Sequence, residues 1–220
     1  MRKRLLAALV VLSSGALALA SEPSRVALPA ARTRGTVAVE AALSQRRSFR
    51  DPAPTPLTLA EVGQLCWAAQ GVTDDKGHRT APSAHAAYPL QVWVLAGAVR
   101  DLPAGTYRYL PAGHALDPVR QGDPRLEFVQ RGVGQMWVAK APVVFVITGT
   151  VAKMAGMGDR AREFMAVEAG LAAQGFFLQA EALGLGSTFV GGFKREEARA
   201  ALELPDGEEV LGVLPVGHRP

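Results

Sequence analysis

The chain has 220 residues, of which 49% are hydrophobic and 20% charged, and its formal net charge is +4. This length fits one domain with a substantial core, and the composition excludes a disordered or fibrous protein. Three basic residues lie within positions 1–20, so the rest of the chain has a net charge of +1, which argues against general nucleic-acid binding.

The first twenty residues have the pattern of a secretory signal peptide. A basic start, MRKR, precedes sixteen mainly apolar residues, LLAALVVLSSGALALA, which end in the small-x-small triplet Ala18-Leu19-Ala20. The alternative is an uncleaved membrane anchor, but the stretch is shorter than the roughly 20 residues that a spanning helix prefers. We therefore expect cleavage before Ser21 and export, to a bacterial periplasm, with no stable membrane anchor afterwards.

An N-terminal arm and one domain are expected after the signal peptide. Residues 21–35 are rich in Pro, Ala and Arg without periodicity and form the arm, and the domain covers residues 36–220. Within it, Thr58-Leu59-Ala60-Glu61 is a capping-box pattern that opens a helix to about Gln70. The apolar face of this helix carries Cys66, the only cysteine, which we expect to be a buried structural thiol.

The remaining chain mixes short strands and helices. Hydrophobic periodicity and turn signals predict, in chain order, a helix at 36–45, a polar loop at 71–79, a strand at 90–97, a hairpin at 105–116 that turns near Pro111–Gly113, a partly helical stretch at 124–140, strands at 141–149 and 186–193, a helix at 195–202 and a strand at 208–217. Because the order lacks strict βαβ alternation, the expected fold class is α+β, with a central, mostly antiparallel sheet.

Residues 159–183 give the longest helical signal. Asp159 is the expected N-cap, and Gly184 is the expected stop just beyond the C-terminus. Between residues 164 and 183 the helix has few polar side chains, and a helix that is apolar on nearly every side is buried on nearly every side. We therefore expect this helix to face a partner subunit as well as the core, in a homodimer.

A basic segment follows the first predicted helix. Within SQRRSFRDP, Arg46, Arg47, Ser48 and Arg50 supply guanidinium forks and a hydroxyl, which match the oxygens of a phosphorylated cofactor. The alternative is a solvated basic helix end, where arginine complements the helix dipole.

Two further segments have a composition that suits a flat ligand. APSAHAAYPLQVWVL (81–95) combines a turn of small residues with a following strand, although an ordinary loop before a strand would look alike. QAEALGLGSTFVGGF (179–193) has glycines that allow close backbone approach and expose N–H donors, although turn chemistry around a strand is the alternative. The four histidines do not fall at metal-ligand spacings, and no Rossmann, P-loop or G-x-S-x-G pattern is present.

Together, in this order and at these separations, the three segments resemble the FMN-dependent nitroreductase family. The family signature combines an N-terminal Arg-Arg/His-Ser-x-Arg/Lys, a central Pro-Ser-Ser/Ala turn before a strand, and a late EALGLG…GGF segment. The chain is most similar to the SagB/ThcOx-type dehydrogenase branch, and the resemblance covers residues 36–217.

The resemblance implies a nitroreductase-like fold, a homodimer and an FMN site at the subunit interface. The site residues it implies are Arg46, Arg47, Ser48 and Arg50 around the FMN phosphate, ribityl chain and pyrimidine edge; Pro82, Ser83 and Ala84 near the isoalloxazine, from the other subunit; Val190, Gly191 and Gly192 near flavin N5; and Arg219 as a candidate phosphate contact.

Some features depart from the branch. Azoline-oxidising members carry a Lys-Tyr pair before the long helix, whereas Lys153 and Met157 stand in that region here. His85 stands where glycine is common, as a proton donor to substrate or as a tolerated loop residue. Since FMN is made in the cytosol, an exported protein either acquires it after export or has lost it.

The sequence thus predicts an exported FMN-dependent oxidoreductase that acts on a small planar molecule by ping-pong hydride transfer. The electron donor is open, with NAD(P)H as one candidate. The alternatives are a non-catalytic flavin-binding protein, a scaffold of the same fold that needs no flavin, and a flavin-destroying oxygenase.

Overall fold

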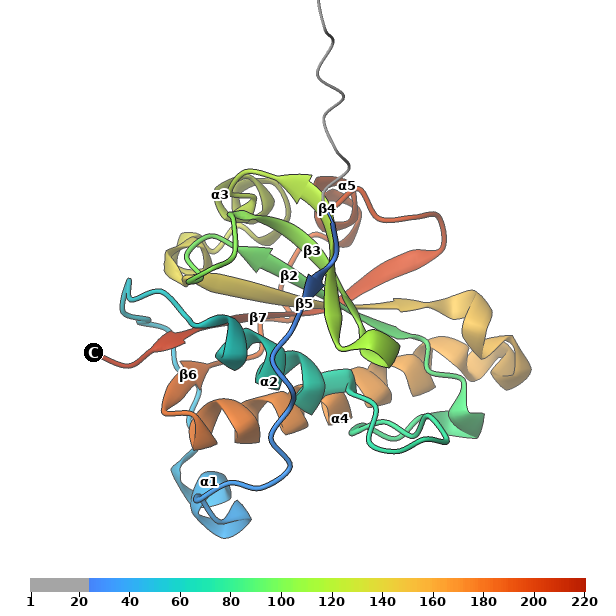
Figure 1. The fold of residues 1–220 in the computed structure, drawn as a ribbon. Helices are drawn as coiled ribbons and strands as arrows, with labels where there is room; N and C mark the ends of the chain where they lie inside the picture. The colour runs from blue at the N-terminus through green and yellow to red at the C-terminus, as the bar shows by residue number, and fades with distance from the viewer. Residues whose placement is uncertain (1–23) are drawn as a thin grey trace, which may run out of the picture.

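The computed structural model describes residues 24–220, and the predicted signal peptide and residues 21–23 of the arm lie outside this part of the chain. Its centre is a seven-stranded sheet in the order β1-β4-β3-β2-β5-β7-β6, in which every neighbouring pair is antiparallel (Figure 1). The strands are β1 (Val26–Ala27), β2 (Leu90–Ala96), β3 (Gly105–Leu110), β4 (Ala115–Gln121), β5 (Val143–Thr150), β6 (Leu185–Ser187) and β7 (Glu208–His218). The predicted α+β class with a mostly antiparallel sheet is confirmed.

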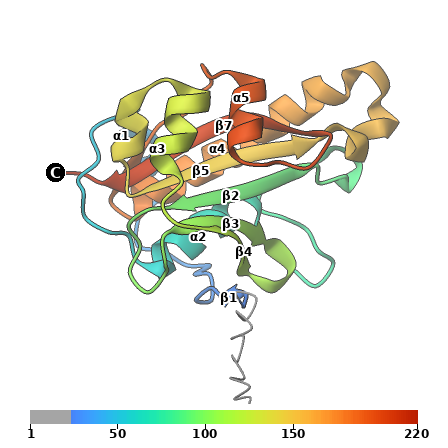
Figure 2. The same ribbon diagram turned by 90° about the horizontal axis from the view of Figure 1, so that it is seen from above.

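Helices cover both faces of this sheet (Figures 1 and 2). The α-helices are α1 (Val39–Gln45), α2 (Leu59–Gln70), α3 (Arg125–Phe128), α4 (Ala161–Ala182) and α5 (Arg195–Ala201). Shorter helical segments are η1 (Ala84–Ala86), η2 (Pro111–Gly113), η4 (Met136–Lys140) and η5 (Val151–Arg160), of 3-10 type, and the π-helical η3 (Val129–Val133). α1, α2 and α4 lie on one side of the sheet, and α3, η3 and α5 lie on the other.

The two faces of β5 belong to two separate hydrophobic cores. Phe145 and Ile147 point toward α2 and α4, and Phe145 makes an edge-on contact with Phe176 of α4, with ring centroids 4.9 Å apart. Val144 and Val146 point toward α3 and α5. This period-2 alternation is what a strand buried on both faces requires, and it fixes the register of the central strands.

Most predicted elements are confirmed, and α2 is the clearest case. Thr58 Oγ1 accepts a hydrogen bond from the Glu61 N–H, and Glu61 Oε2 accepts one from the Thr58 N–H, which completes the capping box. Cys66 is fully buried, and burial raises the pKa of its thiol. The hairpin of β3 and β4 turns at Pro111–Gly113, as predicted.

Two predicted boundaries are wrong. Asp159 does not cap the long helix, because residues 151–160 form the 3-10 segment η5, and α4 begins at Ala161 without a side-chain cap. The expected strand at 186–193 is shorter: β6 ends at Ser187, and only Val190 pairs again with β7, at Val213. The C-terminal prediction for α4 is confirmed, since Gly184 adopts a φ of +73°, which favours glycine.

Within the single chain, α4 is not buried on nearly every side. Its core face carries Met165 and Phe176, which are fully buried, whereas Val167 is 56% exposed and Leu171 is 45% exposed. Large apolar side chains are thus left uncovered on one face of the longest helix. Within residues 24–220, no helix combines the length and the apolar character that crossing a membrane requires.

Candidate functional site

The basic segment lies along the edge of the sheet. The Phe49 N–H donates to the Ser187 carbonyl of β6 at 3.0 Å, and Ser48 and Ser187 form a parallel bridge. The Phe49 ring packs directly on Gly186, where an added Cβ would lie 2.2 Å from the ring. The side chain of Phe49 thus fixes the segment against β6, and this close approach explains one glycine of the late glycine-rich motif.

The arginines of this segment differ in how far they are already engaged. Arg47 Nη1 donates to the carbonyls of Ser44 and Arg46, at 2.9 and 2.8 Å, and so closes the C-terminus of α1. The side chains of Arg46 and Arg50 form no hydrogen bond or ion pair with the part of the chain that the structure describes. Their guanidinium groups are therefore available for an anionic ligand.

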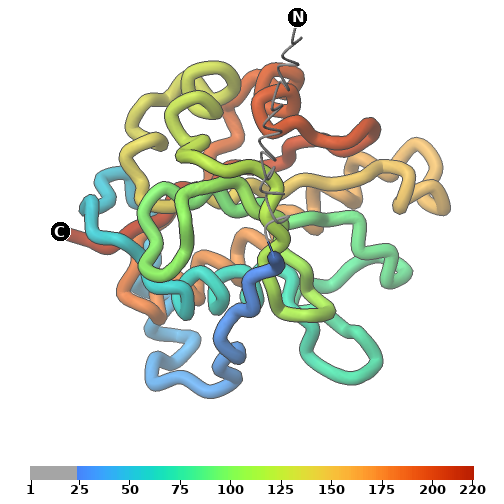
Figure 3. The backbone as a smooth tube through the Cα atoms, turned by 45° about the horizontal axis from the view of Figure 1, so that its top comes forward, coloured from blue at the N-terminus to red at the C-terminus, as the bar shows by residue number. Residues whose placement is uncertain are grey.

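The C-terminus lies beside the segment that follows α1 (Figure 3) and brings a further guanidinium group to the same place. Arg219 lies 5.9 Å from the centroid of the Phe49 ring, and its Nη2 is 2.5 Å from Glu181 Oε2 near the end of α4. The Ala53 N–H also donates to the His218 carbonyl at 2.9 Å. The predicted Arg219 thus lies beside the basic segment, but its charge is already balanced by Glu181.

The predicted Pro82–Ala84 segment begins a strained turn. The Ala84 N–H donates to Oε1 of Glu168 on α4 at 2.8 Å, and Ser83 Oγ accepts from the Tyr88 N–H at 2.8 Å. His85, Ala86 and Tyr88 have φ values of +52°, +53° and +45°, in the left-handed region that L residues rarely adopt. Strain of this kind concentrates at functional sites.

Replacing Ala86 by glycine is expected to stabilise the protein. A left-handed conformation costs a non-glycine residue roughly 1–2 kcal/mol, and glycine loses roughly 0.5–1 kcal/mol in chain entropy. The free energy of unfolding should therefore rise by about 0.5–1 kcal/mol, measured by urea denaturation. Ala87, whose φ is −68°, is the matched control, and Ala87→Gly should lower the same quantity by a similar amount. Equal signs for the two variants would contradict a strained turn.

The glycine pair Gly191–Gly192 is exposed beside the same sheet edge. Val190 exchanges two backbone hydrogen bonds with Val213, at 2.9 and 3.1 Å, and the chain then leaves the sheet. The Gly191 and Gly192 N–H groups find no acceptor within residues 24–220. At Gly192 an added Cβ would meet only the Gln135 side chain, at 3.9 Å. Two backbone donors are therefore presented on an open surface.

One chain does not bring all the predicted site residues together. Glu168, which holds Ala84, and Glu181, which holds Arg219, are 13 positions apart on α4. At a rise of 1.5 Å per residue, this places the two regions about 20 Å apart along the helix. The basic segment, Arg219 and the glycine pair share one sheet edge, whereas Pro82–Ala84 lies toward the other end of α4.

Two residues that the sequence analysis did not select have a place in this arrangement. Glu168 is buried, and its carboxylate supports the strained turn. Its position is the signal that could have identified it, since Glu168 is the only charged residue between Glu163 and Glu181 in the apolar middle of α4. Gln135 Nε2 donates to the Gly192 carbonyl at 3.1 Å, and no local sequence pattern points to that contact.

The family follows from comparison with known proteins. Residues 43–218 match the family model described as the nitroreductase family. The chain belongs to the nitroreductase family. Members of the nitroreductase family are flavin oxidoreductases, and the chain is an oxidoreductase of this family.

Relatives agree with this assignment over most of the chain. A curated protein of Methanocaldococcus jannaschii, described as a nitroreductase, is 35% identical over 184 residues, which cover 83% of this chain and 92% of the relative. A crystal structure described as a nitroreductase of Ralstonia eutropha JMP134 is 30% identical, covers 91% of each chain and superposes with a TM-score of 0.80. A Vibrio harveyi enzyme shares the nitroreductase fold at 20% identity, with a TM-score of 0.59 over 82% of this chain and 68% of that chain.

The residues at the sheet edge fit a flavin nucleotide. The guanidinium groups of Arg46 and Arg50 without carboxylate partners suit a phosphate, and the two N–H groups of the glycine pair suit an acceptor on a flat ring. The open space at Gly192 leaves room for the ring to approach the backbone. The chemistry of the donor set therefore agrees with the cofactor class of the nitroreductase family.

Proposed function

We propose that the protein is an FMN-dependent oxidoreductase that acts on a small planar molecule. The observation that carries this proposal is that two kinds of donor lie along one edge of the sheet. They are the guanidinium groups of Arg46 and Arg50, which have no partner within residues 24–220, and the exposed N–H groups of Gly191 and Gly192. FMN, when bound, would supply the redox chemistry of a ping-pong hydride transfer between a donor and a second substrate. The Vibrio harveyi fold relative is named an NADPH:FMN oxidoreductase, which supports this cofactor.

The residues of the chain divide the binding of this cofactor between them. Arg46 and Arg50 bind the phosphate, assisted by the Ser48 hydroxyl and by the Arg47 nitrogens that α1 does not use. The Gly191 and Gly192 N–H groups donate toward the reactive edge of the ring. An arginine of the basic segment near the pyrimidine edge of the ring would stabilise the negative charge of the reduced flavin.

A second copy of the chain completes the site in this proposal. The basic segment and Pro82–Ala84 are about 20 Å apart along α4, so one chain does not bring the two sets of predicted contacts together. The uncovered side chains of Val167 and Leu171 on α4, and of Val39 and Leu43 on α1, offer an apolar surface for a homodimer contact. In such a dimer, Pro82, Ser83 and Ala84 of one chain approach the cofactor held by the other.

The finer assignment rests on sequence motifs. The PSA turn and the EALGLG…GGF segment support a SagB/ThcOx-type dehydrogenase, while the absence of a Lys-Tyr dipeptide counts against azoline oxidation. The N-terminal pattern supports export to the periplasm. NAD(P)H is concentrated in the cytosol, so an exported enzyme would need a donor available outside it or a reaction before export.

Flavin uptake tests the proposal. Residues 21–220 are expressed without the predicted signal, offered FMN, and passed through a gel-filtration column while visible absorption is recorded. We expect flavin absorption with one FMN per chain, in a peak of dimer size. A colourless protein that refuses FMN would overturn the enzyme proposal in favour of a scaffold, and a coloured monomer would overturn the two-chain site.

A further inference from the structure

The glycine pair Gly191–Gly192 lies between two residues whose backbones are hydrogen-bonded to other elements. On one side, Val190 is paired with Val213 of β7. On the other side, the Lys194 N–H donates to the Gly132 carbonyl at 2.8 Å. Between these anchors the backbone has no regular secondary structure, and glycine has the largest conformational freedom of any residue. A segment of this kind needs a third contact if its N–H groups are to keep one direction.

The Gln135 side chain provides that third contact. Its Nε2 donates to the Gly192 carbonyl at 3.1 Å, and its Oε1 accepts from Trp137 Nε1 at 3.2 Å. An indole nitrogen can only donate, so the Trp137 contact requires the amide oxygen on its side. The amide nitrogen must then face Gly192, and the direction of the Gln135 amide is fixed by its surroundings.

Gln135 follows η3, on the face of the sheet that α3 and α5 cover. The preceding π-helical segment η3 ends in a left-handed turn at Gly134, and π-helical turns occur frequently at functional sites. Gly132 packs so closely on α5 that an added Cβ would lie 2.6 Å from the Ala198 Cα. The backbone at Gly132, just before Gln135, is therefore in direct contact with the backbone of α5.

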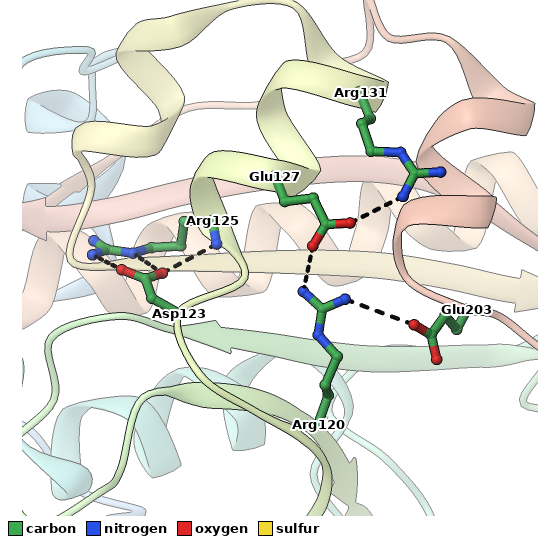
Figure 4. Close-up of polar contacts among 6 residues, drawn as sticks. All are labelled: Arg120, Asp123, Arg125, Glu127, Arg131 and Glu203. Atoms are coloured by element: carbon green, nitrogen blue, oxygen red, sulfur yellow. Dashed lines mark hydrogen bonds and ion pairs between the residues drawn. The ribbon is translucent and has the colours of Figure 1, made fainter.

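Ion pairs tie the same support to the sheet (Figure 4). Glu127 of α3 accepts from Arg120 of β4 at 2.8 Å and from Arg131 of η3 at 2.9 Å, and both contacts lower the pKa of the Glu127 carboxyl. Arg120 also lies 3.7 Å from Glu203, which follows α5. These contacts connect β4, α3, the residue that follows α5 and η3, the segment directly before the turn that carries Gln135.

We propose that Gln135 is a positioning residue for the cofactor contact made by Gly191 and Gly192. By holding the Gly192 carbonyl, its amide keeps the neighbouring peptide N–H groups aimed at the reactive edge of the bound ring. This inference rests on the proposed function, because it assigns the glycine pair to the cofactor. It adds a residue that is distant in sequence from the three motifs but contacts the last of them, and on which the electronic properties of the bound cofactor depend.

Three variants test the inference. Gln135→Met keeps the approximate size and removes both hydrogen bonds, whereas Gln135→Glu keeps an acceptor for Trp137 and removes the donor to Gly192. Gln130→Met is the matched control, since Gln130 is exposed in η3, five positions before Gln135, and its side chain makes no hydrogen bond with residues 24–220. Thermal unfolding of each variant confirms that it is folded.

Amide hydrogen exchange of Val190 and Lys194, measured without FMN, is the first readout, because these two N–H groups are hydrogen-bonded on either side of the glycine pair, whereas the Gly191 and Gly192 N–H groups have no acceptor within residues 24–220 and no protection to lose. Loss of one hydrogen bond of about 1 kcal/mol should speed exchange by roughly 5-fold in both Gln135 variants and leave Gln130→Met unchanged. The second readout is the equilibrium of bound FMN with a redox dye, where the ratio of oxidised to reduced cofactor should rise by roughly 5-fold. FMN affinity should change less than threefold, because the phosphate contacts remain.

The outcomes separate the inference from the proposed function. Unchanged exchange in both Gln135 variants, or an equal change in Gln130→Met, would overturn the anchoring contact whether or not FMN binds. Faster exchange with an unchanged dye equilibrium would overturn the link to the cofactor. Wild-type protein that takes up no FMN would overturn the proposed function, and with it the role of Gln135 toward the cofactor, while the exchange data would still decide the contact itself.

Discussion

Replacing Arg46 and Arg50 together by alanine is expected to weaken FMN binding by at least about 100-fold. A hydrogen bond to a charged group contributes roughly 1.5–3 kcal/mol, so losing two such partners of the phosphate corresponds to a factor of about 10² to 10⁴. These two guanidinium groups are the right targets, because Arg47 already closes α1 and Arg219 is already paired with Glu181. Quenching of FMN fluorescence during titration measures the dissociation constant.

Arg25→Ala is the matched control for this loss of positive charge. Arg25 precedes β1, which forms the opposite edge of the sheet from β6, and it is well exposed. Its removal should change FMN affinity by less than threefold, since charges separated by more than a Debye length are screened. Lysine in place of both Arg46 and Arg50 should give an intermediate affinity, because an ammonium keeps the charge but not the planar fork. Equal losses for the control and the double variant would refute a local phosphate contact.

The local elements of this fold could be predicted where the signal lies within a few residues. The capping box at Thr58–Glu61 and the left-handed stop at Gly184 are satisfied by their own neighbours, and both are confirmed. Asp159 failed because residues 151–160 take up a separate 3-10 segment before α4 begins. The expected strand at 186–193 was too long because only Val190 finds a partner on β7 after β6 ends. Such boundaries depend on tertiary pairing, which periodicity does not contain.

The candidate site was predictable as three separate segments, but not as an arrangement. Glycine and arginine motifs indicate which backbone can approach a ligand and which side chains can bind an anion. The distance between the basic segment and Pro82–Ala84 depends on where each lies along α4. Ala84 is bound to Glu168, whereas Arg219, which lies beside the basic segment, is bound to Glu181. The contact between Gln135 and Gly192 joins residues 57 positions apart on different elements. Sequence spacing cannot reveal a hydrogen bond of that kind.

Two inactive variants are expected to restore binding when they are combined in one dimer. The first variant carries Arg46→Ala with Arg50→Ala, and the second carries Ala84→Trp, which fills the space beside the turn without removing its N–H. If each site takes its basic segment from one chain and Ala84 from the other, a mixed dimer has one site with both lesions and one intact site. Random assortment makes half of the dimers mixed, so about a quarter of the wild-type sites should bind FMN.

Co-expression of the two variants, followed by purification and measurement of FMN per chain, gives this result directly. The comparison is a mixture of the arginine variant with a chain that carries all three substitutions, in which no intact site can form. The outcome is decisive because, if each site were built within one chain, every chain would carry its own lesion and no site in a mixed dimer would be intact. Recovery to about a quarter in the first mixture and none in the second would establish that two chains build each site. No recovery in either mixture, when the arginine variant and the Ala84→Trp variant are each folded and dimeric on their own, would refute the two-chain site.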